Sequence, residues 1–257
     1  MSAMGLDLNF WLYPALFLAA LVAGTMDTIA GGGGLITVPI LMGLGWPPQV
    51  ALGTNKLQAS FGSGSATLHF SQAGAIDWRG CLWGIGFTAV GATLGTLLVG
   101  SLPQDLLKRI IPWLLVSIAL YVLFSPRLGQ EEIRPRLGAT AFHLILGLSL
   151  GFYDGFFGPG TGSFWAAGYM LLRGQEMRSA TAQTKVMNFT SNIVSLAFFA
   201  AMGCVVIVPG LVMAAGQFAG GRLGARLVLA QGARMIRPVF VVIAMALAAK
   251  LLIDAYL

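Results

Sequence analysis

Two glycine-rich stretches decide the fold: Gly24-Thr-Met-Asp-Thr-Ile-Ala-Gly-Gly-Gly-Gly34 and Gly151-Phe-Tyr-Asp-Gly-Phe-Phe-Gly-Pro-Gly-Thr-Gly162. Each ends a long apolar run, and each carries one acid, Asp27 or Asp154. Four consecutive glycines do not continue a helix, because each costs about 1 kcal/mol relative to alanine there. Both stretches therefore predict a break in a helix, followed by the start of a new one.

The composition places these breaks inside a membrane protein. Of the 257 residues, 57% are hydrophobic and only 9% are charged, whereas roughly a quarter is charged in a soluble domain. The 15 Lys and Arg residues are dispersed along the chain, many of them in or next to the short gaps between apolar runs. That spacing is a topology signal and argues against nucleic-acid binding. We expect an all-α polytopic protein in the lipid bilayer.

Apolar segments that can form helices follow one another along the whole chain. They are 10–30, 34–44, 50–73, 81–100, 105–124, 138–157, 162–172, 179–202, 209–229 and 235–256. Most approach the roughly twenty residues that a span requires, but 34–44 and 162–172 are much shorter. The sequence thus predicts eight long transmembrane helices and two short helices after the glycine-rich breaks.

The same order of segments occurs twice, which indicates two homologous halves. Residues match at an offset of 129, including two lysines within apolar segments; the pairs are Gly45 and Gly174, Ala51 and Ala180, Lys56 and Lys185, Gly74 and Gly203, Gly91 and Gly220, and Gly95 and Gly224. Several matches at one offset argue for duplication. We expect a first half over 1–125, a polar linker over 126–137 and a second half over 138–257, forming one transporter domain together.

The basic residues bear on the orientation of the halves. If both short segments cross fully, ten passes result, the halves are inverted, and only Lys108 and Arg109 lie opposite the basic face. If each short segment only completes a broken helix, eight passes result and the halves are parallel. The charge distribution favours inversion. Both counts place the two termini outside.

Asp27 and Asp154 are candidates for coupling or charge balance, because an acid within a membrane is costly and usually faces a cavity or a partner. The alternative is that each caps the next short helix. The short helices begin with free N–H groups and the positive end of a dipole, which suits an anion. Glycine that only permits close helix packing is the alternative there, and it fits Gly84, Gly91, Gly95, Gly220 and Gly224 better.

Two further segments combine a lysine with small polar side chains. Lys185, Asn188 and Asn192 fall on one helix face, and Lys56 and Ser63 align similarly. Such helices line a cavity or an interhelical seam, although a lysine that extends to the membrane surface is the alternative. The predicted substrate-binding residues are Gly32, Gly33, Asn55, Lys56, Ser63, Pro159, Gly160, Thr161, Thr184, Lys185, Asn188 and Asn192.

These motifs resemble the sulfite exporter TauE/SafE family, in particular its bacterial YfcA-like branch. The resemblance rests on Asp27 with Gly31 to Gly34, on Ala51-Leu-Gly-Thr-Asn-Lys56, on the second glycine-rich stretch and on Ala180-Thr-Ala-Gln-Thr-Lys185, and it extends over nearly the whole chain. It implies an inner-membrane transporter of two homologous halves that moves sulfite or small organosulfur anions.

We therefore expect a multi-pass secondary transporter, an exporter by resemblance, in the bacterial inner (plasma) membrane. Its substrate would be a small sulfur-containing anion, held between the halves, with a proton or a sodium ion for coupling. No cofactor, metal or enzymatic activity is expected, and a homodimer is one assembly considered. The alternatives are an uncoupled anion channel or facilitator, and an intramembrane sulfur-handling enzyme or partner.

Overall fold

A computed structural model describes residues 9–124 and 134–231, and within them every regular element is a helix. The helices are α1 (Leu12–Ala30), α2 (Gly34–Gly43), α3 (Pro48–Gln72), α4 (Trp78–Ser101), α5 (Gln104–Phe124), α6 (Ala139–Phe156), α7 (Thr161–Arg173), α8 (Met177–Ala201) and α9 (Ile207–Gln231). Each matches one of the predicted segments. The tenth segment, 235–256, lies outside the described residues.

The glycine-rich breaks end α1 and α6 as predicted. α1 ends at Ala30, and Gly31 adopts a left-handed conformation with φ of 75° while its N–H donates to the Asp27 carbonyl. In the second break Gly158 and Gly160 have φ of 98° and 85°. Glycine accepts this conformation without the steric cost that a Cβ brings. The helices that follow, α2 and α7, have only 10 and 13 residues, which confirms the two short helices.

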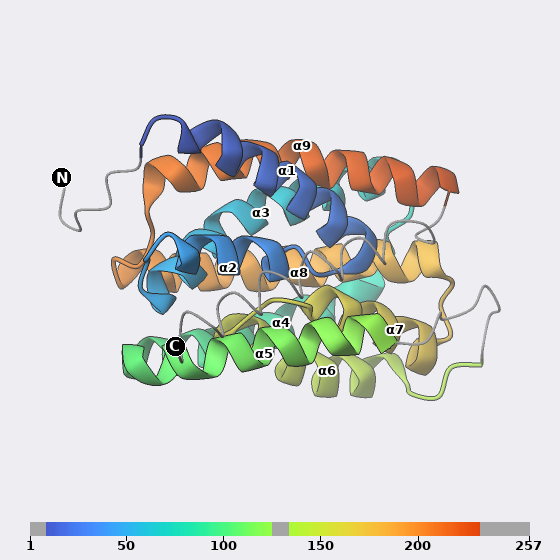
Figure 1. The fold of residues 1–257 in the computed structure, drawn as a ribbon. Helices are drawn as coiled ribbons and strands as arrows, with labels where there is room; N and C mark the ends of the chain where they lie inside the picture. The colour runs from blue at the N-terminus through green and yellow to red at the C-terminus, as the bar shows by residue number, and fades with distance from the viewer. Residues whose placement is uncertain (1–8, 125–133, 232–257) are drawn as a thin grey trace.

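The helices of the two predicted halves are interleaved (Figure 1). α3 and α8 pack against each other in the middle. α1 of the first half packs against α9 of the second, while α6 of the second half packs against α4 of the first. The outer helices also cover the central pair in the same pattern, because α9 lies on α3 and α4 lies on α8. Neither half is a separate body in this arrangement.

Glycines form the seams between these outer helices. A Cβ on Gly91 would overlap the backbone of Leu148, and a Cβ on Gly220 would overlap the backbone of Leu21. Small residues allow membrane helices to approach closely and to gain van der Waals contact. The packing role predicted for these glycines is confirmed.

An apolar core joins α5 to α2 and to the second glycine-rich break. Leu107, Ile111 and Leu115 of α5 are buried together with Leu35 of α2 and Phe157 of the second break. This core fixes α2 and the second break against a long helix. The polar faces of α3 and α8 are thereby left to line the interior.

Two of the described helices, α1 and α4, are long and apolar enough to cross a bilayer by length and composition alone. The other long helices fall outside that criterion; α3 and α8 carry many Ser, Thr and Asn residues and one buried lysine each. Eight long transmembrane helices therefore stay a prediction, as do the boundaries at 125, 126–137 and 138.

Candidate functional site

The two glycine-rich breaks touch each other near the centre of the molecule. A Cβ on Gly162 would lie 2.5 Å from the Cα of Gly31, and a Cβ on Gly34 would lie 3.0 Å from the Pro159 ring. The Ser163 hydroxyl donates a hydrogen bond to the Ala30 carbonyl across the same contact. The first turns of α2 and α7 therefore meet at one place.

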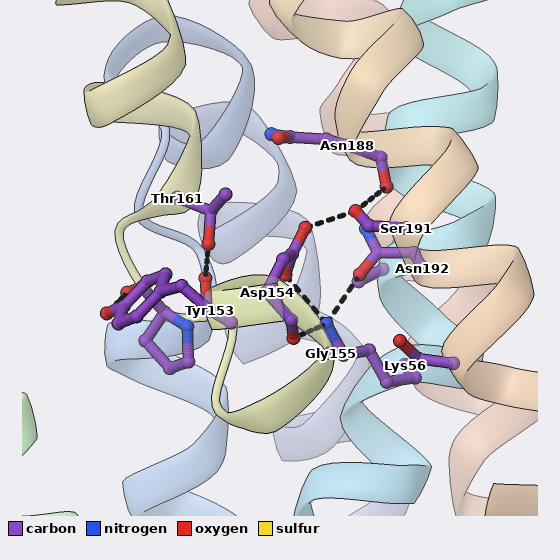
Figure 2. Close-up of polar contacts among 12 residues, drawn as sticks. Lys56, Tyr153, Asp154, Gly155, Thr161, Asn188, Ser191 and Asn192 are labelled. Carbon is purple, nitrogen blue, oxygen red and sulfur yellow. Dashed lines mark hydrogen bonds and ion pairs between the residues drawn. The ribbon is translucent and has the colours of Figure 1, made fainter. Parts of the chain in front are cut away.

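Lys56 of α3 forms an ion pair with Asp154, which lies near the end of α6 (Figure 2). Its Nζ lies 2.7 Å from Asp154 Oδ1, 2.6 Å from the Asp154 carbonyl oxygen and 3.2 Å from Asn192 Oδ1. The other carboxylate oxygen, Oδ2, accepts a hydrogen bond from the Ser191 hydroxyl. Both side chains are buried, with exposed fractions of 1% and 4%.

Lys185 of α8 forms the corresponding pair with Asp27, near the end of α1. The ammonium nitrogen lies 2.8 Å from Asp27 Oδ2 and 2.5 Å from the Asp27 carbonyl oxygen. The backbone N–H of Gly33 donates to Asp27 Oδ1 at 3.1 Å. Lys185 is buried, but 24% of the Asp27 side chain is exposed.

Both ion pairs join opposite halves of the sequence. Lysines buried to this degree do not extend to the membrane surface, so that alternative is excluded in the structure. A buried charge without a partner carries a large desolvation cost, and pairing with hydrogen bonds offsets it. Asp27 also accepts a hydrogen bond from the N–H of Gly33, the residue directly before α2, so it contacts the start of that helix and Lys185 at the same time.

A small polar cavity of about 20 Å³ lies between the two pairs. It is lined by Asp27, Gly34, Asn55, Lys56, Ala59, Asp154, Gly158, Thr161, Gly162, Asn188 and Asn192. A volume of this size holds about one water molecule. Asn188 is 4% exposed, and its Oδ1 has no hydrogen-bond partner among the described residues. The first turns of α2 and α7 reach the same cavity through Gly34, Thr161 and Gly162. Most N–H groups of these turns donate to carbonyls of the glycine-rich breaks, as Leu35 does to Gly32 and Thr161 to Gly158.

The cavity gathers half of the residues predicted to form the site. Its lining includes the predicted residues Asp27, Asn55, Lys56, Asp154, Thr161, Asn188 and Asn192. Of the others, Lys185 and Gly33 contact Asp27, and Ser63 accepts a hydrogen bond from the Asn192 amide at 3.4 Å. Gly32, Pro159, Gly160 and Thr184 are not among the lining residues. Pro159 instead accepts the Tyr153 hydroxyl through its carbonyl, and the Thr184 hydroxyl bonds to its own helix.

Five residues at the site were not predicted from the sequence. They are Gly34, Ala59, Gly158, Gly162 and Ser191. The repeat could have indicated Ala59, because it matches Asn188 at the offset of 129. Ser191 directly precedes a predicted residue, yet only the tertiary structure shows that its hydroxyl reaches Asp154.

Comparison with known proteins supports the same assignment over most of the chain. The family model "Sulfite exporter TauE/SafE" matches residues 16–251. A probable membrane transporter protein of a Sinorhizobium species is 46% identical over 96% of this chain and 95% of its own length. The probable membrane transporter protein YfcA of Escherichia coli K12 is 46% identical over 94% of this chain and 90% of its own. A probable membrane transporter protein of Haemophilus influenzae is 43% identical over 97% of this chain and 98% of its own length. This chain therefore belongs to the sulfite exporter TauE/SafE family of membrane transporters.

Proposed function

We propose that this protein is a secondary transporter that moves a small sulfur-containing anion, such as sulfite or an organosulfonate, out of the cell by alternating access. The observation that carries the proposal is the pair of buried Lys–Asp contacts that cross between the halves and border one polar cavity. The sulfur-containing substrate is proposed from the description of the family, sulfite exporter TauE/SafE.

The chemistry of the cavity suits a small oxyanion. Lys56 and the amides of Asn55, Asn188 and Asn192 line the cavity, Lys185 lies next to it on Asp27, and the N-terminal ends of α2 and α7 border it. Helix N-termini and lysines attract negative charge. Glycines along the breaks let the backbone approach a ligand without side chains in between.

The size of the cavity favours alternating access over an open channel. A cavity of about 20 Å³ holds about one water molecule, so in this proposal an oxyanion enters when contacts around the ion pairs rearrange. A site where helices of both halves meet is the arrangement expected for alternating access, in which one group of helices moves against another.

The membrane topology belongs to the same proposal. Two inverted halves, over 1–125 and 138–257, would place the site near the middle of the bacterial inner membrane with both termini outside. The interleaved packing supports a two-fold relation between the halves, because each half contributes equivalent helices to equivalent contacts, and the distribution of basic residues favours inversion. A proton or a sodium ion would couple transport, and the assembly would be a monomer or a homodimer.

Transport by purified protein in liposomes tests this function. Sulfite and sulfoacetate flux should be abolished by Lys185→Ala and by Asp154→Asn, because each variant removes one member of a cross-half pair. Lys108→Ala is the matched control, since Lys108 is exposed on α5 and 3.9 Å from the exposed Asp105. Full flux in both site variants would refute the site, and folded protein in all variants is verified by gel filtration.

A further inference from the structure

We propose that Asp27 carries the transported proton, whereas Asp154 stays ionised throughout as the fixed counter-ion of Lys56. This inference rests on the proposed function, because it assumes that an anion enters the site. It assigns different roles to two acids that the sequence repeat makes equivalent.

The charge balance of the site requires one added positive charge when an anion enters, and in this proposal a proton supplies it. Lys56 and Lys185 carry two positive charges, and Asp27 and Asp154 carry two negative charges, so the site is neutral as it stands. A monovalent anion that enters would leave one negative charge without a partner in a buried place, which is costly. Protonation of one carboxylate removes that cost and frees its lysine for the anion.

The surroundings of the two acids differ in a way that selects Asp27. In each acid one carboxylate oxygen contacts a lysine and the other accepts a hydrogen bond, but Asp154 is 4% exposed and accepts from the buried Ser191 hydroxyl. Asp27 is 24% exposed, and its partners are Lys185 and one backbone N–H. Hydrogen bonds to a carboxylate stabilise its ionised form, and access to water allows proton exchange.

The sequence repeat explains why the two acids differ. At the offset of 129, Ser191 corresponds to Gly62 and Asn192 corresponds to Ser63. The first half therefore lacks the hydroxyl that would hold Asp27 in the way that Ser191 holds Asp154. Lys56 also has a third acceptor, the Asn192 amide oxygen, whereas within residues 9–124 and 134–231 Lys185 donates only to two oxygens of Asp27.

Few other ionisable groups face Asp27. Lys185 of α8 contacts it directly, and Lys56 of α3 and Asp154 of α6 line the same cavity. α2 contains no ionisable side chain. On the remaining neighbours, Arg173 of α7 donates to the Leu137 carbonyl, and Arg222 and Arg226 of α9 are exposed.

The proton and charge balance of one cycle follows from these contacts. The Asp27 carboxylate takes a proton from water and releases the Lys185 ammonium, which pairs with the entering anion. The charges of the two lysines, the Asp154 carboxylate and a monovalent anion then sum to zero. When the anion leaves, Asp27 returns its proton to water on the same side and pairs with Lys185 again. One proton thus moves with each monovalent anion, in the same direction.

Labelling with dicyclohexylcarbodiimide tests this assignment without any substrate. The reagent modifies protonated carboxyl groups within membranes, and mass spectrometry counts the acylurea and the amide to a neighbouring lysine at each acid. Asp27 should be modified, because its carboxyl group exchanges the proton in this proposal, and Asp154 should stay unmodified. Equal or greater modification of Asp154 would overturn the proposal, as would no modification of Asp27.

Two variants sharpen the test. Ser191→Ala should make Asp154 susceptible to the reagent, because its second oxygen loses a buried donor; unchanged protection would contradict the role of that hydroxyl. In liposomes, Asp27→Asn should remove the pH-gradient dependence of sulfite flux while sulfite still binds, and retained dependence would overturn the proposal. If sulfite proves not to bind at all, the proposed substrate fails, but the labelling result still decides which acid exchanges its proton.

Discussion

Lys56 and Lys185 show what can be predicted from the sequence at the scale of single residues. Their repeat spacing and their apolar surroundings identify both as buried functional candidates. Which acid each lysine contacts could not be predicted, because the pairs join residues 98 and 158 positions apart. Asp27 lies nearer to Lys56 in sequence, yet it pairs with Lys185. Only the packing of α1 and α6 against the opposite half decides this.

The two ion pairs should contribute differently to stability. Lys56→Ala leaves Asp154 buried without its counter-charge, which costs about 3–5 kcal/mol in unfolding free energy. Lys185→Ala should cost less, because the exposed fraction of Asp27 lets water reach its carboxylate. Unfolding of the purified variants in mixed micelles measures both.

A double variant separates charge from packing in the first pair. Lys56→Met with Asp154→Leu removes both charges and should recover most of the stability that Lys56→Ala loses, while transport stays lost. A double variant as unstable as Lys56→Ala would show that the ion pair is not the source of the effect.

At the scale of helices, the glycines account for both the breaks and the seams. The existence of two short helices could be predicted from sequence, because consecutive glycines disfavour helix continuation. The contact between the two breaks could not, since the approach of Gly31 to Gly162 depends on α1 and α7 meeting across the halves. Glycine-lined helix seams were predicted, but their partners were not.

A matched pair of substitutions within α4 tests the seam with α6. A Cβ on Gly95 would overlap the Phe152 carbonyl, whereas a Cβ on Gly86 meets no atom within 4 Å. Gly95→Ala should therefore destabilise the protein by about 1–3 kcal/mol through overpacking, and Gly86→Ala should be neutral or slightly stabilising. Thermal unfolding in detergent compares them, and equal effects would contradict the close seam.

At the scale of the whole molecule, the halves are interleaved rather than side by side. The duplication is predicted from one shared offset. The packing of α1 and α6 against helices of the opposite half could not be predicted, because a repeat does not indicate which of its helices contact each other. The consequence is that the site belongs to neither half. Residues from α1, α3, α6, α7 and α8 all reach the cavity or its ion pairs.

The proposed inverted topology has a direct experimental consequence. Ala73 and Met202 are exposed at equivalent positions, before the turns at Gly74 and Gly203. In a background with Cys81→Ser and Cys204→Ser, single cysteines at these two positions should be labelled by an impermeant maleimide from opposite faces of the membrane. Labelling from the same face would establish parallel halves instead.

Binding of small anions to the purified protein tests the central claim most directly. Thermal stability is measured with sulfite, sulfate, thiosulfate, sulfoacetate, taurine and simple carboxylates, for the wild type and for Lys56→Ala, Lys185→Ala and the surface control Lys108→Ala. The account predicts strong stabilisation by a sulfur-containing anion in the wild type and in Lys108→Ala, and its loss in both site variants. Stabilisation that persists in Lys56→Ala and Lys185→Ala would contradict an anion site between the two cross-half ion pairs.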